Sequence, residues 1–167
     1  MARTSEQSSK PEARALDRID RRILRTLQED GRLSNVELAR RVGLSATPCL
    51  ERVRRLERAG YIIGYRALLS PHKLDAALLA FVQVTLDRTT PDAFEQFRTT
   101  VVAMPEVLEC HMVAGGFDYL LKVRVRDMGA YRRFLGETLT AIRGISQTHT
   151  YVVMEEVKAD APLPVGP

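Results

Sequence analysis

Three apolar stripes of helical spacing follow one another within residues 16–60. The second stripe begins after Ser34 and the third after Ser45, and a serine hydroxyl can cap the first turn of a helix. Between these two stripes stands Gly43, a residue type that readily takes the left-handed conformation that ends a helix. A helix, a tight turn containing glycine and a second helix are typical of a helix-turn-helix.

The third predicted helix has an apolar face and an arginine-rich far side. A step of 100° per residue gathers its small and apolar residues along one line, and the arginines fall opposite or on the flanks. Such a helix fits a DNA major groove, where arginine binds guanine edges or phosphates. The alternative is a solvated helix whose arginines pair with nearby glutamates. We favour DNA and expect contacts from Ser34, Asn35, Ser45, Thr47, Pro48, Glu51, Arg52, Arg54, Arg55 and Arg58.

The pattern changes after Gly60. Tyr61–Leu69 predicts a β-rich wing or strand, and the polar, proline-containing segment after it predicts a hinge. The first residues lack periodicity and predict a disordered arm. The expected divisions are an arm at 1–15, a DNA-binding domain at 16–69, a hinge at 70–77, a second domain at 78–158 and a tail at 159–167.

Strands and helices are expected to alternate in the second domain. Its periodicities predict strands at Leu78–Leu86, Val107–Val113, Asp118–Val125 and Ile145–Val157, and helices at Pro91–Met104 and Met128–Ile142. The order β-α-β-β-α-β is the ferredoxin-like arrangement, so the predicted class is α+β. Two helices cover only one face of a four-stranded sheet, and apolar residues occur in both registers. We therefore expect a second copy of the chain on the other face, and a dimer also suits a two-fold symmetric DNA site.

Basic charge is concentrated in the first half of the chain. Residues 16–68 hold twelve arginines against seven acidic residues, a net charge of +5, whereas residues 77–157 carry a net charge of −2. This asymmetry is expected if only the first half binds phosphates. The N-terminal residues are polar, and the longest apolar run, Ala76–Val82, is too short to cross a bilayer. We expect a cytoplasmic, nucleoid-associated protein without a membrane span.

Candidate metal ligands and catalytic groups form no recognisable set. Cys49 and Cys110 are far apart, and the three histidines lack ligand spacing. No Ser-His-Asp set can be assembled, so we expect no catalysis, no metal and no cofactor. The glycine turn at residues 115–119 offers free amides and a carboxylate suited to an amino acid at a subunit junction. A plain hairpin turn is the alternative.

The chain carries four further motifs in succession: LDRIDRRILRTLQEDGRLSNVELARRVGLSATPCLERVRRLERAGYIIGY, SPHKLDAALL, GGFDYLLKVRV and TYVVMEEVK. Together they resemble the Lrp/AsnC family of bacterial and archaeal transcription regulators, from about Leu16 to Lys158. The resemblance implies an N-terminal winged helix-turn-helix and a C-terminal ferredoxin-like, ACT-like domain that responds to an amino acid. It also implies homodimers that pair through their sheets and build octamers or larger assemblies on double-stranded DNA.

The resemblance also indicates where an effector would act. The effector-response positions of leucine-responsive members fall on Met112, Asp118, Met128, Thr140, Tyr151, Val152 and Val153, to which the turn adds Gly115 and Gly116. Asp118 and Tyr151 match those members in kind. Gly116 stands where they usually carry Asp, and Met112 and Thr140 stand where they carry Leu. The effector is therefore leucine or another amino acid.

Three functions follow from these patterns. The first is a sequence-selective transcriptional regulator that responds to an amino acid such as leucine. The second is an architectural DNA-binding protein without effector, which equal binding to a specific and a scrambled site would favour. The third is an enzyme or metabolite-binding module on the ferredoxin-like half, which the missing catalytic groups disfavour.

Overall fold

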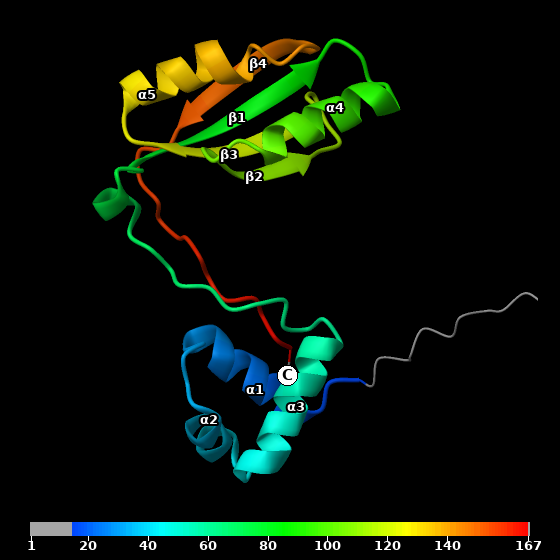
Figure 1. Cartoon of the computed structure of the whole chain (residues 1–167), viewed down its shortest axis with the longest axis vertical. Helices are drawn as coiled ribbons and strands as arrows, with labels where there is room; N and C mark the ends of the chain where they lie inside the picture. The colour runs from blue at the N-terminus through cyan, green and yellow to red at the C-terminus, as the bar shows by residue number, and fades with distance from the viewer. Residues whose placement is uncertain (1–14, 167) are drawn as a thin grey trace, which may run out of the picture. The chain divides into compact units, whose positions relative to one another are not determined.

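A computed structural model describes residues 15–166, which Figure 1 shows. These residues form two compact units. One unit ends at Ala67 and also takes in the segment from Lys158 onward, and the other is Leu68–Val157. The arm predicted for residues 1–15 lies outside the described residues, except for Ala15.

The first unit contains three helices, α1 (Arg18–Glu29), α2 (Asn35–Val42) and α3 (Ala46–Arg58). Ser34 caps α2, because its hydroxyl accepts a hydrogen bond from the Glu37 amide at 3.2 Å. Ser45 stands at the start of α3, but its hydroxyl makes no capping bond, so the predicted cap is absent there. Gly43 takes a φ of 76°, a left-handed conformation that glycine adopts without steric cost. The predicted helix-turn-helix is confirmed.

A small apolar core joins the three helices. Its buried members come from each of them: Ile23, Leu38, Ala39, Val42, Cys49 and Leu56. Cys49 is 0% exposed, and burial raises the pKa of its thiol. It therefore packs as a small apolar residue.

The segment after α3 is extended but forms no strand. A β-rich wing or strand was predicted at Tyr61–Leu69, and the strand is absent from this segment in residues 15–166. A strand needs a neighbouring strand to exchange backbone hydrogen bonds, and within residues 15–166 this segment has none. Ile63 in this segment is 97% exposed. The hinge that follows contains a single 3₁₀ turn, η1 (Pro71–Leu74).

The C-terminal segment bonds to α1 through its backbone. Arg25 Nη2 donates to the carbonyl oxygens of Val165 and Gly166 at 2.9 and 2.5 Å. The side-chain amide of Gln28 donates to the Leu163 carbonyl at 3.0 Å and accepts from the Leu163 backbone amide at 2.7 Å. The acceptors on the tail are main-chain carbonyls, so this contact depends on the path of the tail rather than on its side chains.

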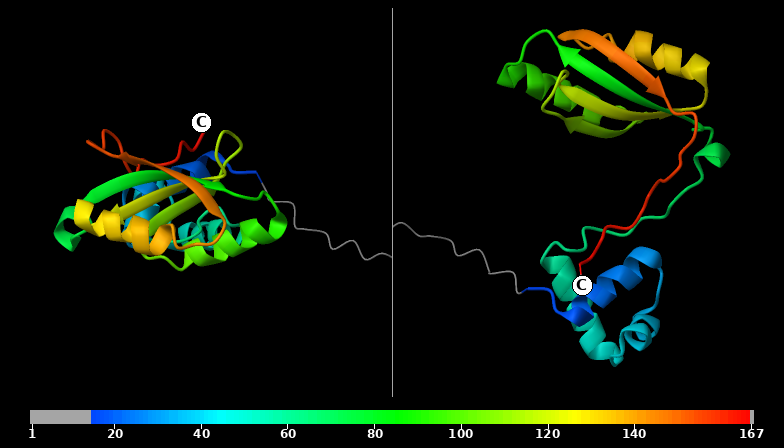
Figure 2. Two further views of the ribbon diagram at one scale, coloured as in Figure 1. Left: turned by 90° about the horizontal axis from the view of Figure 1, so that it is seen from above. Right: turned by 180° about the vertical axis from the view of Figure 1, so that it is seen from behind.

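The second unit is an antiparallel sheet with two helices on one face (Figure 2). The sheet order is β2-β3-β1-β4, which is the predicted ferredoxin-like arrangement. Helix α5 continues into a wider π-helical segment, η2. The elements are β1 (Leu78–Leu86), α4 (Pro91–Val102), β2 (Val107–Met112), β3 (Tyr119–Val125), α5 (Met128–Arg133), η2 (Phe134–Leu139) and β4 (Ile145–Val152). The last strand was expected to reach Val157, but it ends at Val152, where its pairing with β1 also ends.

The two faces of the sheet differ in burial. The helix-facing side holds the main core, in which the Phe97 ring lies 4.4 Å from that of Tyr119 between centroids. On the opposite side, Phe81 pairs with Tyr151 across β1 and β4, and directly opposed residues of an antiparallel pair share a face. Within the second unit no helix covers this side, and Tyr151 is 53% exposed.

Candidate functional site

One side of α3 is fully exposed. Its exposed residues Thr47, Glu51, Arg54 and Arg58 form what we call the outer arc. They are three or four residues apart and therefore share one side of the helix. Cys49 and Leu56, on other sides, are buried in the core. The outer arc is thus the part of α3 that a DNA groove can reach, while Pro48 is half-buried in the first turn, where it costs no helical hydrogen bond.

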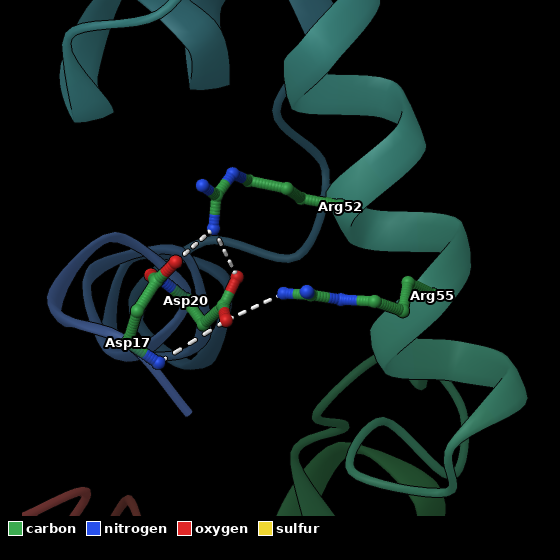
Figure 3. Close-up of polar contacts among 4 residues, drawn as sticks. All are labelled: Asp17, Asp20, Arg52 and Arg55. Carbon is green, nitrogen blue, oxygen red and sulfur yellow. Dashed lines mark hydrogen bonds and ion pairs between the residues drawn. The ribbon is translucent and has the colours of Figure 1, made fainter. Parts of the chain in front are cut away.

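The other two arginines of α3 bind carboxylates of α1 (Figure 3). Arg52 Nη1 lies 2.5 Å from Asp17 Oδ2 and 2.8 Å from Asp20 Oδ1, and Arg55 Nη2 lies 2.5 Å from Asp20 Oδ2. We call these four residues the α1–α3 cluster. Asp20 is 1% exposed and is the one buried charged residue among the described residues. Two of the arginines expected at DNA are therefore held against α1.

The start of α1 builds the acidic half of this cluster. Asp17 and Asp20 form a capping box, in which Asp17 Oδ1 accepts from the Asp20 amide at 2.8 Å and Asp20 Oδ2 accepts from the Asp17 amide at 3.2 Å. The hydrogen bond from Arg52, followed by that from the Asp20 amide, lowers the pKa of Asp17 to about 2. The spacing of three residues recurs in Arg52 and Arg55. These matching spacings of three residues on α1 and α3 are the signal in the sequence for the contact.

Residues expected at DNA also tie α2 to α3. Asn35 Nδ2 donates to the Ala46 carbonyl at 2.7 Å, so Asn35 holds the first turn of α3. Ser34 and Ser45 are both exposed at helix starts.

On α2, the side chains of Arg40 and Arg41 bind the carboxylate of Glu37. These two hydrogen bonds lower the pKa of Glu37 to about 2.

The expected effector residues fall into two groups in a single chain. Met112, Gly115, Gly116, Asp118 and Thr140 lie toward the end of β1 at Leu86, whereas Met128, Tyr151, Val152 and Val153 lie toward its start. Tyr119 pairs with Val84, and the Val153 amide donates to the Leu79 carbonyl. A strand rises about 3.3 Å per residue, so these two positions on β1 are roughly 16 Å apart. One chain alone does not bring the groups into one site.

Asp118 forms hydrogen bonds with the backbone at the end of β1 in the same chain. Its Oδ2 accepts a hydrogen bond from the Leu86 amide at 2.7 Å, and its own amide donates to the Val84 carbonyl at 3.0 Å. One carboxylate oxygen is thus engaged in the fold, and the other has no hydrogen bond within the described residues. Gly115 and Gly116 are exposed, with open space where a side chain would stand.

Two surface hollows lie at opposite ends of the sheet. One of about 350 Å³ is lined by His72, Leu79 and Val153 among others, and one of about 210 Å³ by Leu86 and Arg143 among others. Val153 is the single expected effector residue in the first, and the second contains none. Neither hollow therefore corresponds to the expected effector set.

The described residues carry neither a membrane span nor a cluster of metal ligands. Residues 15–166 contain no helix long and apolar enough for a bilayer. Across this range, no three His, Cys, Asp or Glu side chains gather as metal ligands would. Cys49 and Cys110 are both free.

Two protein families match the chain. The family described as Lrp/AsnC ligand binding domain matches residues 79–163, and the one described as winged helix-turn-helix DNA-binding matches residues 16–63. The chain belongs to the Lrp/AsnC family. The resemblance drawn from the sequence motifs is confirmed.

Curated relatives of this Lrp/AsnC protein include two bacterial regulators. It is 66% identical to the leucine-responsive regulatory protein of Escherichia coli strain K12 over 151 residues, which are 90% of this chain and 92% of the relative. It is 68% identical to that of Serratia marcescens over 143 residues, 86% of this chain and 87% of the relative. The protein is thus a homologue of leucine-responsive transcriptional regulators.

Solved structures of family members share the fold. A transcriptional regulator from Neisseria meningitidis, solved as a complex with L-methionine, has a TM-score of 0.87 at 43% identity and covers 90% of this chain and 97% of its own. An AsnC family regulator from Agrobacterium tumefaciens has a TM-score of 0.85 at 37% identity, with the same coverage. This Lrp/AsnC protein therefore joins a helix-turn-helix DNA-binding domain to an Lrp/AsnC ligand-binding domain.

Proposed function

We propose that this protein is a sequence-selective transcriptional regulator that binds double-stranded DNA through α3. The observation that carries the proposal is the outer arc, whose four exposed side chains lie on one side of a helix that buries Cys49 and Leu56 in the core. Arginine can bind guanine O6 and N7 together, and glutamate can accept from cytosine N4. The net charge of +5 over residues 16–68 supplies attraction to phosphates.

The helix starts supply the remaining DNA contacts. Ser34 and Ser45 are exposed at the first turns of α2 and α3, where backbone amides and the helix dipole favour phosphate. Asn35 and Pro48 shape the start of α3 and contact DNA less directly. Contacts of this kind fix the register of a protein on the duplex, and base contacts from the outer arc give selectivity.

Selection of sites from random duplexes tests the DNA proposal. At about 150 mM salt we expect enrichment of a two-fold symmetric motif whose half-sites lie about one helical turn, 10 base pairs, apart. Absence of any enriched motif would contradict it. Arg98→Ala on α4 is a matched control, because Arg98 is an exposed arginine of the other unit, and it should select the same motif.

We further propose that copies pair through the uncovered sheet face and assemble to octamers or larger. Phe81 and Tyr151 lie side by side on that face. A charged residue there should oppose pairing, so Phe81→Lys should reduce the mass measured by light scattering. Val102→Lys on α4, at a position 78% exposed, should leave the mass unchanged. Equal masses for both variants and the unaltered chain would remove this face from the assembly.

The proposed effector is an amino acid bound where two copies meet. The support is the separation of the two groups of effector residues, since the first group of one copy needs the second group of another to complete a site. The neighbour solved with L-methionine and the leucine-responsive relatives support this ligand class. Leucine is the first candidate and methionine the second.

A thermal-shift screen against the twenty amino acids tests the effector proposal. A ligand present at 100 times its Kd stabilises the folded state by about 2.7 kcal/mol, so one or a few related amino acids should raise the Tm. Thr140→Ala should reduce that rise. Thr100→Ala is the matched control, because both hydroxyls donate to the carbonyl four residues earlier. No rise with any amino acid would contradict the proposal.

The protein is proposed to act on chromosomal DNA in the cytoplasm and to catalyse no reaction. The support is that its relatives are named as regulatory proteins and carry the same DNA-binding domain. Cross-linking in growing cells tests this. Enrichment of DNA with the protein is the expected result, and recovery without DNA would contradict it.

A further inference from the structure

The four arginines of α3 fall into two pairs with different surroundings. Arg54 and Arg58 are exposed and make no ion pair within the described residues. Arg52 and Arg55 have side chains only 27% and 33% exposed, and both reach Asp20. Figure 3 shows their guanidinium groups pointing from α3 toward the start of α1.

The α1–α3 cluster gives α3 two polar attachment points in addition to its apolar core. Arg52 and Arg55 are three residues apart, so their two attachment points are separated by about 4.5 Å along the helix axis. Added to the apolar core, two separate attachments resist tilting and turning of α3 more than one would. Each residue step turns the helix by 100°, so the direction of the outer arc depends on this rotation.

If these arginines were released to bind DNA, the buried carboxylate of Asp20 would lose its ion-pair partners. Its side chain is 2% exposed, and its carboxylate is bonded to both guanidinium groups and the Asp17 amide. A buried carboxylate without its partners is strongly unfavourable, because little water can replace them. The cluster also has two carboxylates and two guanidinium groups, so as a whole it adds no net charge for phosphate to attract.

We propose that Arg52 and Arg55 are positioning residues that hold α3 through Asp17 and Asp20, and that Arg54 and Arg58 are the arginines of α3 that contact DNA. This inference rests on the proposed function, because it assigns roles within the same interface. All four arginines of α3 were expected at DNA from the sequence, and the structure separates them into two pairs.

A double-substitution cycle on DNA affinity separates the two roles. If Arg55 acts through Asp20, then Arg55→Gln should change the Kd less than about 2-fold once Asp20→Asn is present. Arg54→Gln is the matched control. It should weaken binding about 10-fold or more in both backgrounds, in the range of one good base contact. Equal losses from Arg55→Gln in both backgrounds would overturn the inference.

A second cycle covers the case in which Asp20→Asn fails to fold. Asp17 has a side chain 42% exposed, so Asp17→Asn disturbs the core less and can be combined with Arg52→Gln. The arginine change should then have a smaller effect on the Kd than in the unaltered chain, because Arg52 keeps only its contact with Asp20. Independent losses would overturn the positioning role of Arg52.

The salt dependence of DNA affinity distinguishes a DNA contact from a purely structural role, because only loss of a phosphate contact changes its slope. Removing one phosphate contact flattens the slope of log K against log salt by about 1. Arg54→Gln or Arg58→Gln should flatten the slope or relax the preference at one base pair. Arg52→Gln and Arg55→Gln should keep the slope of the unaltered chain, and a flatter slope for either would overturn the inference.

These outcomes are distinct from failure of the proposed function. The salt slope can be measured on any duplex, including a scrambled one. Equal binding to selected and scrambled duplexes would remove the proposed selectivity, while the slopes would still decide which arginines touch DNA.

Discussion

Replacing Asp20 by asparagine keeps the size of the side chain and removes its charge. The carboxylate accepts a hydrogen bond from Arg52 at 2.8 Å and forms an ion pair with Arg55 at 2.5 Å. A hydrogen bond to a charged group contributes about 1.5–3 kcal/mol, so two contacts of at most that strength set an upper limit of about 6 kcal/mol. Arg52 keeps its contact with Asp17, and both arginines are about a third exposed and can recover water. We therefore expect the first unit to lose about 2–4 kcal/mol of unfolding free energy.

Hydrogen exchange of the full chain, read by mass spectrometry, measures this loss in the first unit alone. Amides in the core of α1 and α3 exchange when the unit opens, so their rates should rise about 30- to 700-fold, at 1.4 kcal/mol for each factor of ten. Amides of the sheet should be unaffected. Unchanged rates in α1 and α3 would refute the idea that Asp20 holds the two helices together.

Glu37→Gln is the matched control for this measurement. It removes the same charge from a carboxylate that also binds two arginines, Arg40 and Arg41. That group lies on the surface, where ion pairs contribute little to stability. Its exchange rates should stay close to those of the unaltered chain, which would assign the effect at Asp20 to burial.

Three further changes test separate parts of the fold by calorimetry. The pKa of Asp17 is about 2 in the folded chain against an ordinary 3.8, so its ion pair stabilises the chain above about pH 4 and is lost as the pH falls toward 2. Asp17→Asn should therefore flatten the acid side of the profile of Tm against pH, and an unchanged profile would contradict this. Gly43→Ala places a side chain at a φ of 76° and should cost about 1–2 kcal/mol, whereas Gly31→Ala, at a backbone that is not left-handed, should cost less. Asp118→Ala leaves the Leu86 amide unpaired and should cost the second unit about 1–3 kcal/mol, while Asp118→Asn keeps an acceptor and most of the stability.

Periodicity alone predicted most of the secondary structure. Tyr119, Leu121, Val123 and Val125 alternate in the sequence, and all four are buried on the helix-facing side of β3. Helical spacing likewise located α1 to α5, and their order fixed the ferredoxin-like sheet. These predictions succeed because a period of two or 3.6 directly reports an element with one buried side.

Contacts between distant residues could not be read in the same way. A helical projection of α3 shows one apolar line and therefore predicts one packed side. In the structure α1 also contacts a neighbouring side of α3, which carries Arg52 and Arg55. The strand predicted at Tyr61–Leu69 is absent from the described residues, because β propensity does not supply a partner strand. Backbone carbonyls of the tail accept hydrogen bonds from Arg25, and no residue type marks such acceptors in a sequence.

The central claim is that the outer arc of α3 reads DNA sequence. The most direct test is the ratio of Kd values for the selected site and a scrambled duplex of equal length at the same salt. For a sequence-selective regulator we expect a ratio of about 10³ or more. A ratio close to one would contradict the account and favour an architectural DNA-binding protein.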